Sequence, residues 1–535
     1  MAFRNMAIFL ALTMAYFAVV SAGKLILNIT DATIAPDGQS RPAVLANGTF
    51  PGPILQGNKG DRFNITVVNQ LQDVDMLTDT TIHWHGIFQT NTSWADGPAF
   101  VTQCPIVTGD SFDYNFHVEQ AGTYWYHSHL SVQYCDGLRG ALVIYDPNDP
   151  YLHKYDVDDE STVITLADWY HTLAQKMPVP AQVDSTLING LGIWSQGNTT
   201  TGKLAVINVV SGVRYRIRLV SISCDPNYLF SIDNHTMTII EADGVSSQPH
   251  TVDQIQIFAG QRYSFILTAS QKPDNYWIRA NPNTGNVGFA NAVNSAILRY
   301  STANKTNPVS SPPKQYNLLK EVDLRPFDNL TVPGQPFIGG VPPDGQNNLV
   351  FGFNQNAGLF TVNNVSYESY PIPVLLQILN GTQNAHDLLP KGSVYSLPKN
   401  TPIEITMPGG LLGGPHPFHL HGHKFAVVRS AGSTTYNYKD PIWRDTVSIG
   451  ATGDNVTIRF MTDNPGPWFL HCHIDWHLEA GLAVVFAEDI PDTSNVVKPT
   501  QQWFDLCPTY MKTHPNISLA RIPSRISMHF DEEQV

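Results

Sequence analysis

The chain is short of charged residues, and of positive charge most of all. Lys, Arg, Asp and Glu make up 14% of its 535 residues, where about 25% is typical of soluble domains. The 31 Lys and Arg residues are outnumbered by 45 Asp and Glu, and the net charge of −14 argues against a nucleic-acid partner. A hydrophobic content of 42% is too high for intrinsic disorder, so we expect a globular protein.

Long hydrophobic runs are almost absent as well. The one exception, residues 6–20, follows Arg4 and overlaps the small-residue pattern Val-Ser-Ala at 20–22, which is typical of a cleaved secretory signal. The run is shorter than the ~20 apolar residues that a membrane-spanning helix needs. We therefore expect residues 1–22 to be a signal peptide, the mature chain to begin near Gly23, and the protein to be secreted and extracellular without a membrane anchor.

Glycosylation sequons support the same compartment. A dozen Asn-x-Ser/Thr triplets occur, which is more than a cytosolic protein has reason to display. They predict a glycoprotein. They include Asn28, Asn47, Asn64, Asn91, Asn198, Asn304, Asn380, Asn455 and Asn516.

A sustained 3.6-residue hydrophobic period is missing beyond the first 22 residues, so we expect few and short helices. Short apolar or alternating runs bounded by Gly, Pro, Asn and Asp recur instead, which is typical of strands. The predicted fold class is all-β. Such runs occupy residues 63–68, 141–145, 213–220, 254–258 and 483–486.

Two proline-containing segments interrupt the pattern of strands. Residues 146–150 and 307–313 have the composition of linkers. We therefore predict three domains, at 23–150, 151–315 and 316–535.

Cysteine is scarce and odd in number. In an oxidising compartment, five cysteines leave at least one thiol without a partner in the chain. That thiol is a candidate for chemistry. The five are Cys104, Cys135, Cys224, Cys472 and Cys507.

Histidine pairs are far more frequent than chance predicts. Random placement of 19 histidines in 535 residues gives fewer than one His-x-His pair, whereas this chain has five. On a strand, residues i and i+2 point to the same face, so each pair can offer two imidazoles to one metal region. The pairs are His83/His85, His127/His129, His419/His421, His421/His423 and His471/His473.

The order of these pairs repeats along the chain. His-Trp-His-Gly at 83–86 and His-Ser-His at 127–129 are echoed by His-Leu-His-Gly at 419–422 and His-Cys-His at 471–473. The first and third domains therefore look like copies of one unit. The middle domain has Tyr-Trp-Ile-Arg at 276–279, where such a pair would fall, so we expect it to share the fold without binding metal.

Cys472 indicates which metal these residues bind. Imidazole alone suits Zn, Cu, Fe and Ni, but a thiolate with two imidazoles is the trigonal blue-copper set, for which His416 and His477 are available. On an extended segment Cys472 points away from His471 and His473, so one short peptide would contact two metal sites and give electrons a covalent route between them. A structural zinc site is the competing interpretation, but it would use more cysteine.

Together these motifs resemble the four copper signatures of multicopper oxidases, and most of all those of the fungal laccases among them. The resemblance extends over nearly the whole mature chain. It implies three cupredoxin domains, each a Greek-key β-barrel, and four copper ions. His416, Cys472 and His477 resemble the type 1 ligands, with Leu482 at the axial position as a non-ligand.

The other ligands follow from the same resemblance. It implies a trinuclear cluster, with ligands supplied equally by the first and third domains. The cluster must then lie between these two domains. The type 2 copper would take His83 and His419, one type 3 copper His85, His127 and His473, and the other His129, His421 and His471. The family pattern leaves His423 unligated, and no metal is assigned to His117, His153, His171, His235, His250, His386, His514 or His529.

The resemblance also implies disulfides and acidic groups. Cys104 would pair with Cys507, and Cys135 with Cys224. Asp225 resembles the acid at the substrate pocket beside His477, where a carboxylate accepts the phenolic proton as a general base. Asp96 resembles the acid that assists proton delivery to reduced oxygen, and Asp445 and Glu479 are weaker candidates.

The resemblance implies the activity of a laccase. A monomer would oxidise small phenolic and aromatic amine substrates one electron at a time and reduce O2 to water. A ferroxidase would need carboxylates for Fe(II) near the type 1 site, an ascorbate oxidase normally has axial Met, and a copper-storage glycoprotein would not need the full ligand set. The tail after Cys507-Pro508 runs through Asn516 to Val535, with Arg521 and Arg525, and is longer than this pattern predicts.

Overall fold

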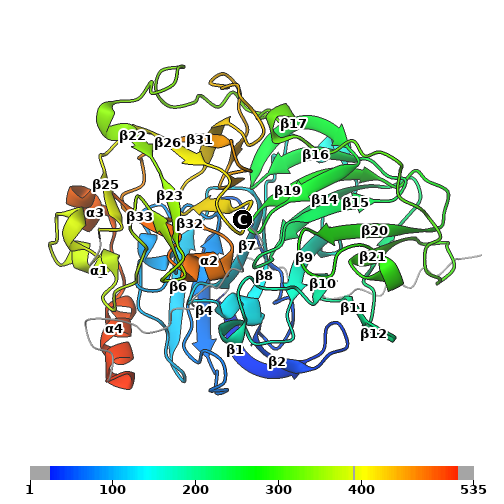
Figure 1. Ribbon diagram of the computed structural model, residues 1–535, viewed down its shortest axis with the longest axis horizontal. Coiled ribbons are helices and arrows are strands. Elements are labelled where there is room, and N and C mark those ends of the chain that lie inside the picture. The colour runs from blue at the N-terminus through cyan, green and yellow to red at the C-terminus, as the bar shows by residue number, and fades with distance from the viewer. Residues whose placement is uncertain (1–23, 390–391, 516–535) are drawn as a thin grey trace, which may run out of the picture.

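The computed structural model describes residues 24–389 and 392–515, and Figure 1 shows strands throughout the chain with few helices. The strands form three groups along the sequence, and among the described residues no sheet takes strands from two groups. The predicted all-β fold class is confirmed. The predicted signal peptide and the tail from residue 516 onward lie outside the described residues.

The first group forms two four-stranded sheets, of order β2-β1-β4-β6 and β3-β8-β7-β5. Val, Ile, Phe and Tyr alternate with polar residues along β4 and β6, which suits strands with one buried face. The strands are β1 (Leu25–Ile34), β2 (Arg41–Ala46), β3 (Leu55–Asn58), β4 (Arg62–Asn69), β5 (Ile82–His85), β6 (Ser111–His117), β7 (Gly122–Ser128) and β8 (Arg139–Tyr145).

The second group forms a six-stranded sheet, β10-β9-β14-β19-β16-β17, a five-stranded sheet, β13-β21-β20-β15-β18, and the hairpin β11-β12. Its strands are β9 (Val163–Trp169), β10 (Ser185–Ile188), β11 (Ile193–Gln196), β12 (Thr199–Gly202), β13 (Val206–Val209), β14 (Arg214–Ser221), β15 (Tyr228–Ile232), β16 (Met237–Ala242), β17 (Val245–Val252), β18 (Gln254–Ile257), β19 (Arg262–Thr268), β20 (Asn275–Pro282) and β21 (Ser295–Tyr300).

The third group forms two five-stranded sheets, β22-β26-β31-β28-β29 and β25-β33-β32-β27-β30, and the hairpin β23-β24. Its strands are β22 (Gln346–Asn348), β23 (Phe351–Asn354), β24 (Leu359–Val362), β25 (Val394–Leu397), β26 (Pro402–Pro408), β27 (Pro417–Leu420), β28 (Phe425–Arg429), β29 (Trp443–Arg444), β30 (Thr446–Ser448), β31 (Asn455–Met461), β32 (Gly466–Cys472) and β33 (Ala483–Glu488).

One topological feature recurs in all three groups. Each main sheet contains one parallel pair of strands, and its other pairs are antiparallel. A mixed sheet of this kind needs connections that cross from one sheet to the other, as in Greek-key arrangements. The shared topology agrees with the internal repeat seen in the sequence. The parallel pairs are β1/β4, β3/β8, β9/β14, β13/β21, β22/β26 and β25/β33.

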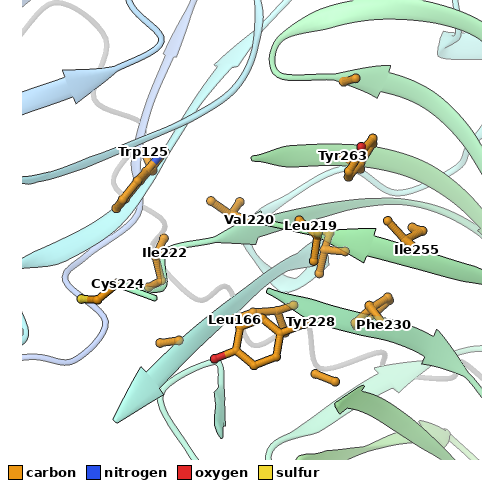
Figure 2. Packing of buried hydrophobic residues seen from close by; sticks show 14 of the residues in the cluster. Trp125, Leu166, Leu219, Val220, Ile222, Cys224, Tyr228, Phe230, Ile255 and Tyr263 are labelled. Carbon is orange, nitrogen blue, oxygen red and sulfur yellow. The ribbon is translucent and has the colours of Figure 1, made fainter. Parts of the chain in front are cut away.

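The hydrophobic core continues across the groups. Figure 2 shows part of the largest cluster, in which Leu219 of β14 and Phe230 of β15 come from the two facing sheets of the second group. Trp125 of β7 joins the same cluster from the first group, and Cys472 of β32 joins it from the third. The three groups are therefore packed through apolar contacts, and these contacts lead directly to the histidine motifs.

The α-helices are few, and α1, α2 and α3 lie near the third group of strands (Figure 1). No helix in the described part of the chain is long and apolar enough to cross a membrane. The longest α-helix, α4, packs back on the first group: Gln502 accepts a hydrogen bond from the amide of Asp113, and the Trp503 indole donates to the Thr102 carbonyl. The α-helices are α1 (Val374–Leu379), α2 (Asp475–Glu479), α3 (Ile490–Val496) and α4 (Gln501–Thr513).

Candidate metal centres

The histidine pairs lie on two strand pairs, one in the first group and one in the third. In the first, His83 on β5 is opposite His127 on β7. In the third, His419 on β27 is opposite His471 on β32. In each pair the second motif partner, two residues on, extends the same face of its strand. The fold thus presents two matching sets of imidazoles, which face one another between the groups.

Side chains from the two sets interleave at the interface. Rings of His85 and His419 stack with centroids 3.7 Å apart, and those of His83 and His421 stack at 3.9 Å. Potential ligand atoms lie within 4.8 Å of one another in three histidine groups: His83/His85/His419, His85/His127/His473 and His129/His421/His471. The structure therefore brings together the eight histidines expected for the trinuclear cluster.

Hydrogen bonds determine which ring nitrogens can bind a metal. The Nδ1 atoms of His83 and His127 lie 2.7 Å and 2.8 Å from the carbonyl oxygens of Asp96 and Ser128. A carbonyl oxygen only accepts, so each Nδ1 carries the hydrogen and each Nε2 keeps a bare lone pair. His419 has the same arrangement, with Nδ1 2.9 Å from the Asp445 carbonyl. Buried Nε2 atoms without a partner belong to His83, His127, His129 and His419.

Two further contacts would be unfavourable without a cation. His471 donates from Nδ1 to the Cys472 carbonyl, and His421 donates from Nδ1 to the Asp96 carboxylate, yet their bare Nε2 atoms lie 3.1 Å apart. His85 Nδ1 and His473 Nε2 lie 3.2 Å apart in the same way. Facing lone pairs at such distances repel unless a positive ion lies between them. The residues present therefore fit bound metal ions.

A separate group of ligands lies within the third group of strands. Cys472 Sγ is 3.4 Å from His416 Nδ1 and 3.7 Å from His477 Nδ1, and the two nitrogens are 3.0 Å apart. His416 donates from Nε2 toward the Leu411 and Leu412 carbonyls, so its Nδ1 is bare. A thiolate and two imidazoles in a buried triangle match the type 1 copper set.

Burial prepares these groups to bind a metal. It lowers the pKa of His416 to about 4 and that of His471 to about 3, and it lowers the pKa values of His477 and His421 well below the ordinary value, so the imidazoles are neutral ligands. Burial raises the pKa of the Cys472 thiol. A cation must therefore displace that proton, as is usual for a thiolate ligand.

Leu482 is fully buried beside the triangle of ligands. Its carbonyl accepts from the Cys472 amide at 3.1 Å, and its amide donates to the His477 carbonyl at 3.0 Å. The amide of Ile474 points at Cys472 Sγ from 3.5 Å. Besides the two imidazoles, the sulfur thus has one weak N–H donor, from Ile474.

Asp225 is half-buried in the turn after β14, joined to the helix that carries His477. The carbonyl of Cys224 accepts from the amide of Asp475 at the start of α2. Burial, and then the carboxylate of Asp168, raise the pKa of Asp225 to about 7. A carboxyl group with that pKa can take up or release a proton near neutrality.

Asp96 is fully buried against the interfacial histidines. Its carboxylate oxygens lie 3.2 Å from His83 Nδ1 and 2.8 Å from His421 Nδ1. Burial raises the pKa of Asp96, and the imidazoles of His83 and His423 oppose that rise only in part. The structure therefore places Asp96 behind ligands of both domains.

Glu479 lies half-buried beside a cavity of about 110 Å³ that reaches His129 and Phe469. Tyr367 and Glu368 line the same cavity. The cavity opens toward the surface beside His129 of the third histidine group.

Four cysteines form two disulfides, Cys104–Cys507 and Cys135–Cys224, and Cys472 is the free thiol. The first disulfide attaches α4 to the first group of strands. The second joins the first group to the second. His423 is also buried, but its Nε2 lies 3.0 Å from Glu488 and its Nδ1 is hydrogen-bonded to the His421 carbonyl.

Contacts of three side chains with the site were not predicted from the sequence. The Tyr134 hydroxyl lies 3.3 Å from His473 Nδ1, the Thr446 hydroxyl lies 3.2 Å from both His85 Nε2 and His419 Nδ1, and Arg262 binds Asp445. A lone Tyr in a 3-10 turn, or a lone Thr or Arg in a strand, carries no motif, so no local signal could have identified them. Their roles follow only from the packing of the three groups.

Comparison with known proteins agrees with this geometry. Three family models described as multicopper oxidase match residues 28–149, 160–303 and 367–492. A laccase of Phlebia radiata is 60% identical over 90% of this chain and 93% of its own, and a laccase of Trametes hirsuta is 59% identical over 95% and 98%. The laccase structure from Botrytis aclada superposes with a TM-score of 0.81 at 32% identity, covering 94% of both chains.

The chain therefore belongs to the multicopper oxidase family, and membership implies copper as its cofactor. Within the family, its place is with the fungal laccases. The resemblance inferred from the histidine and cysteine motifs is confirmed.

Proposed function

We propose that this protein is a secreted laccase that holds four copper ions and couples one-electron oxidation of phenols and aromatic amines to reduction of O2 to water. The observation that carries the proposal is the pairing of bare, buried imidazole nitrogens around two separate sites, one with a thiolate and one without. Copper supplies a one-electron acceptor at the first site and an O2-reducing centre at the second.

The ligands divide between the sites as follows. His416, Cys472 and His477 would hold the type 1 ion, and Leu482 would lie beside it without binding it. His83 and His419 hold the type 2 ion. The two type 3 ions take His85, His127 and His473, and His129, His421 and His471. Since His471 and His473 flank Cys472, the backbone of one tripeptide links both sites.

Asp225 is proposed to act on the substrate. Its carboxylate accepts the phenolic proton when an electron leaves the ring, which avoids forming a high-energy phenol cation. Loss of an electron and a proton from the same phenol leaves a neutral radical. His477, on the helix joined to the Asp225 turn, is the ligand closest to that event.

Asp96 is proposed to supply protons on the oxygen side. It contacts imidazoles of both ligand sets, and its raised pKa favours a carboxyl group that can hold a proton. Glu479 is a second candidate, because it lines the cavity that reaches His129.

The remaining parts of the proposal concern processing and architecture. Domains at 23–150, 151–315 and 316–535 agree with the three groups of strands. Secretion through a signal peptide at 1–22 is supported by two disulfides and by sequons on exposed residues. The secreted protein is proposed to be a monomer. The exposed sequon asparagines are Asn47, Asn91, Asn198, Asn234, Asn304, Asn329, Asn364 and Asn380.

The decisive experiment measures O2 uptake by the copper-loaded protein with a diphenol, Fe(II) and ascorbate in parallel, and assays peroxide in each. We expect fast uptake with the diphenol, slow uptake with the other donors and no peroxide. Preference for Fe(II) would replace the proposed activity with that of a ferroxidase and remove the substrate role of Asp225. The copper ligands would be unaffected by that outcome.

A further inference from the structure

The second group of strands supplies no histidine ligand, yet one of its side chains reaches the interfacial site. Arg262, the first residue of β19, is fully buried. Its Nη1 and Nη2 atoms each donate to one carboxylate oxygen of Asp445 at 2.7 Å. Such a bidentate pair fixes the carboxylate plane as well as its position.

Arg262 also contacts the first group of strands. Its Nε donates at 2.8 Å to the carbonyl of Thr123 on β7, the strand that carries His127. Its Nη1 donates in addition to the Gly260 carbonyl at 3.0 Å. One guanidinium therefore connects all three groups, and four of its five N–H groups have acceptors.

A second residue of the middle group holds the same segment. The Asp243 carboxylate accepts from Arg444 Nε at 2.9 Å, from the Thr446 amide at 3.3 Å and from the Arg262 amide at 2.8 Å. Arg444, Asp445 and Thr446 are consecutive. The second group of strands thus forms hydrogen bonds with each of these three residues, and two of them, Asp445 and Thr446, contact interfacial histidines.

That segment orients two ligands from different groups of strands. Asp445 Oδ1 and the Thr446 hydroxyl lie 3.3 Å and 3.2 Å from His85 Nε2, so they accept its hydrogen and leave Nδ1 bare. His419 Nδ1 is 2.9 Å from the Asp445 carbonyl and 3.2 Å from the Thr446 hydroxyl.

The glycine after His85 makes room for this contact. Gly86 has a φ of +89°, and a Cβ there would lie 2.6 Å from Arg262 Nη2 and 2.7 Å from Asp445 Oδ2. The last residue of the His-Trp-His-Gly motif is therefore needed for the close approach of the ion pair as well as for its own backbone conformation.

We propose that Arg262 is a positioning residue of the interfacial copper site: it holds Asp445 so that His85 and His419 keep their metal-binding nitrogens aimed at the cluster. This inference rests on the proposed function. It gives the ligand-free middle domain a direct part in metal binding, because its Arg262 and Asp243 set the register between the two halves of the site.

The alternative is that Arg262 only stabilises the fold, as many buried ion pairs do. A matched control separates the two roles. Arg279 is also buried, on β20 of the same group, and forms a bidentate pair with Asp233 at 2.8 Å and 2.8 Å. That pair lies wholly within the middle group and has no recorded contact with a histidine of the site.

The test compares copper-loaded wild type, Arg262→Gln, Arg262→Lys and Arg279→Gln, dialysed against a graded chelator. Copper content is measured by elemental analysis, the type 2 ion by its EPR hyperfine splitting, and the type 1 ion by its blue absorption. We expect Arg262→Gln to hold the interfacial copper about 10- to 100-fold less tightly, with altered hyperfine splitting and intact blue absorption. Arg262→Lys keeps the positive charge but loses the bidentate geometry of the guanidinium. Its copper retention should therefore lie between those of wild type and Arg262→Gln.

Each outcome decides between the alternatives. Arg279→Gln with wild-type copper retention supports the positioning role, whereas equal copper loss in Arg262→Gln and Arg279→Gln overturns it. A second variant, Thr446→Val, removes one hydroxyl, keeps the side-chain shape and can be used if Arg262→Gln does not fold. Unchanged type 2 hyperfine splitting and unchanged copper retention in Thr446→Val would overturn the proposal. Wild type that fails to retain interfacial copper would instead overturn the proposed function.

Discussion

The two proposed metal centres are built in opposite ways. The triangle of His416, Cys472 and His477 comes from one group of strands and the short helix α2. The proposed interfacial centre takes four histidines from each of the first and third groups, and Arg262 and Asp243 of the second group bind the segment that supports them. The triangle can persist if the groups separate slightly, whereas the interfacial centre cannot form within any one of them.

This difference predicts which of the two centres should respond to substitutions far from the copper ligands. A small shift between groups leaves the distances inside the triangle unchanged but alters every cross-interface distance, such as the 3.2 Å between His85 and His473. Contacts that join the groups should therefore affect the interfacial centre first. The variants below test this expectation.

Replacing the thiolate should have the largest effect and should confine it to one centre. We expect Cys472→Ser to abolish the blue absorption and to lower O2 uptake with a diphenol by more than about 1,000-fold, because a hydroxyl is a poor ligand for the type 1 ion. The EPR signal of the interfacial copper should remain. Loss of both signals would show that the two centres do not assemble independently.

Removing the disulfide that fastens α4 should have the converse effect. The double variant Cys104→Ser/Cys507→Ser should lose about 2 to 5 kcal/mol in the free energy of unfolding. In a denaturant titration its interfacial EPR signal should disappear before its blue absorption. Simultaneous loss of both signals would contradict the expected order.

The substrate side of the type 1 centre can be changed without touching a ligand. Asp225→Asn should lower kcat/KM for a phenol by about 100-fold where the carboxylate is ionised. With a pKa of about 7, Asp225 becomes ionised as the pH rises through 7, so it assists the reaction above that pH and not below it. The Asp225→Asn variant should not show this increase in kcat/KM above pH 7.

A donor without an ionisable proton, such as ferrocyanide, provides the control for Asp225→Asn. Its oxidation should be equal in wild type and variant at every pH. A matching loss with ferrocyanide would show that the substitution damages the type 1 centre itself.

The axial position should tune one centre only. Leu482→Met offers a thioether that stabilises Cu(II), so we expect a fall in the type 1 potential of at least about 60 mV, a tenfold change in a one-electron equilibrium. Redox titration of the blue absorption measures the fall. An altered type 2 EPR signal would be unexpected.

The smallest effect should come from a contact between the first and second groups that involves no proposed copper ligand. His171 Nε2 lies 2.7 Å from buried Asp37, and Ser185 also donates to that carboxylate. His171→Gln should cost about 1 kcal/mol. Neither copper signal should change in the folded protein.

The sign of the pH dependence follows from the two partners. Hydrogen bonding to Asp37 raises the pKa of His171 despite its burial, so the stabilisation is present below 6.5 and is lost as the pH rises through the folded pKa. Hydrogen bonds from His171 and Ser185 lower the pKa of Asp37, so its share is lost as the pH falls below 3.8. The wild-type advantage in thermal unfolding should therefore be greatest between these values; a constant difference across pH would contradict the ion pair.

Much of the fold was accessible from the sequence because strands carry a local signal. Runs at 63–68 and 213–220 alternate or are continuously apolar, and they lie in β4 and β14. The helix α4 was not singled out, since Pro508 within it discourages a helix. Its packing through Trp503 and Cys507 outweighs that preference.

The site divides in the same way. His-x-His spacing predicts imidazoles on one face of a strand, a purely local inference. That β5 and β7 face β27 and β32 depends on how whole domains pack, and here only family resemblance could supply the answer. Arg262 and Thr446 act across interfaces without any motif, so neither the pattern nor the resemblance pointed to them.

The tripeptide His471-Cys472-His473 limits how such a protein can change over time. Alternation along an extended chain gives the thiolate to one centre and both imidazoles to the other. Insertion or deletion of a single residue inside the tripeptide would turn part of it to the opposite face and deprive both centres at once. Surface loops can change in length during evolution, whereas this tripeptide can change only by substitution.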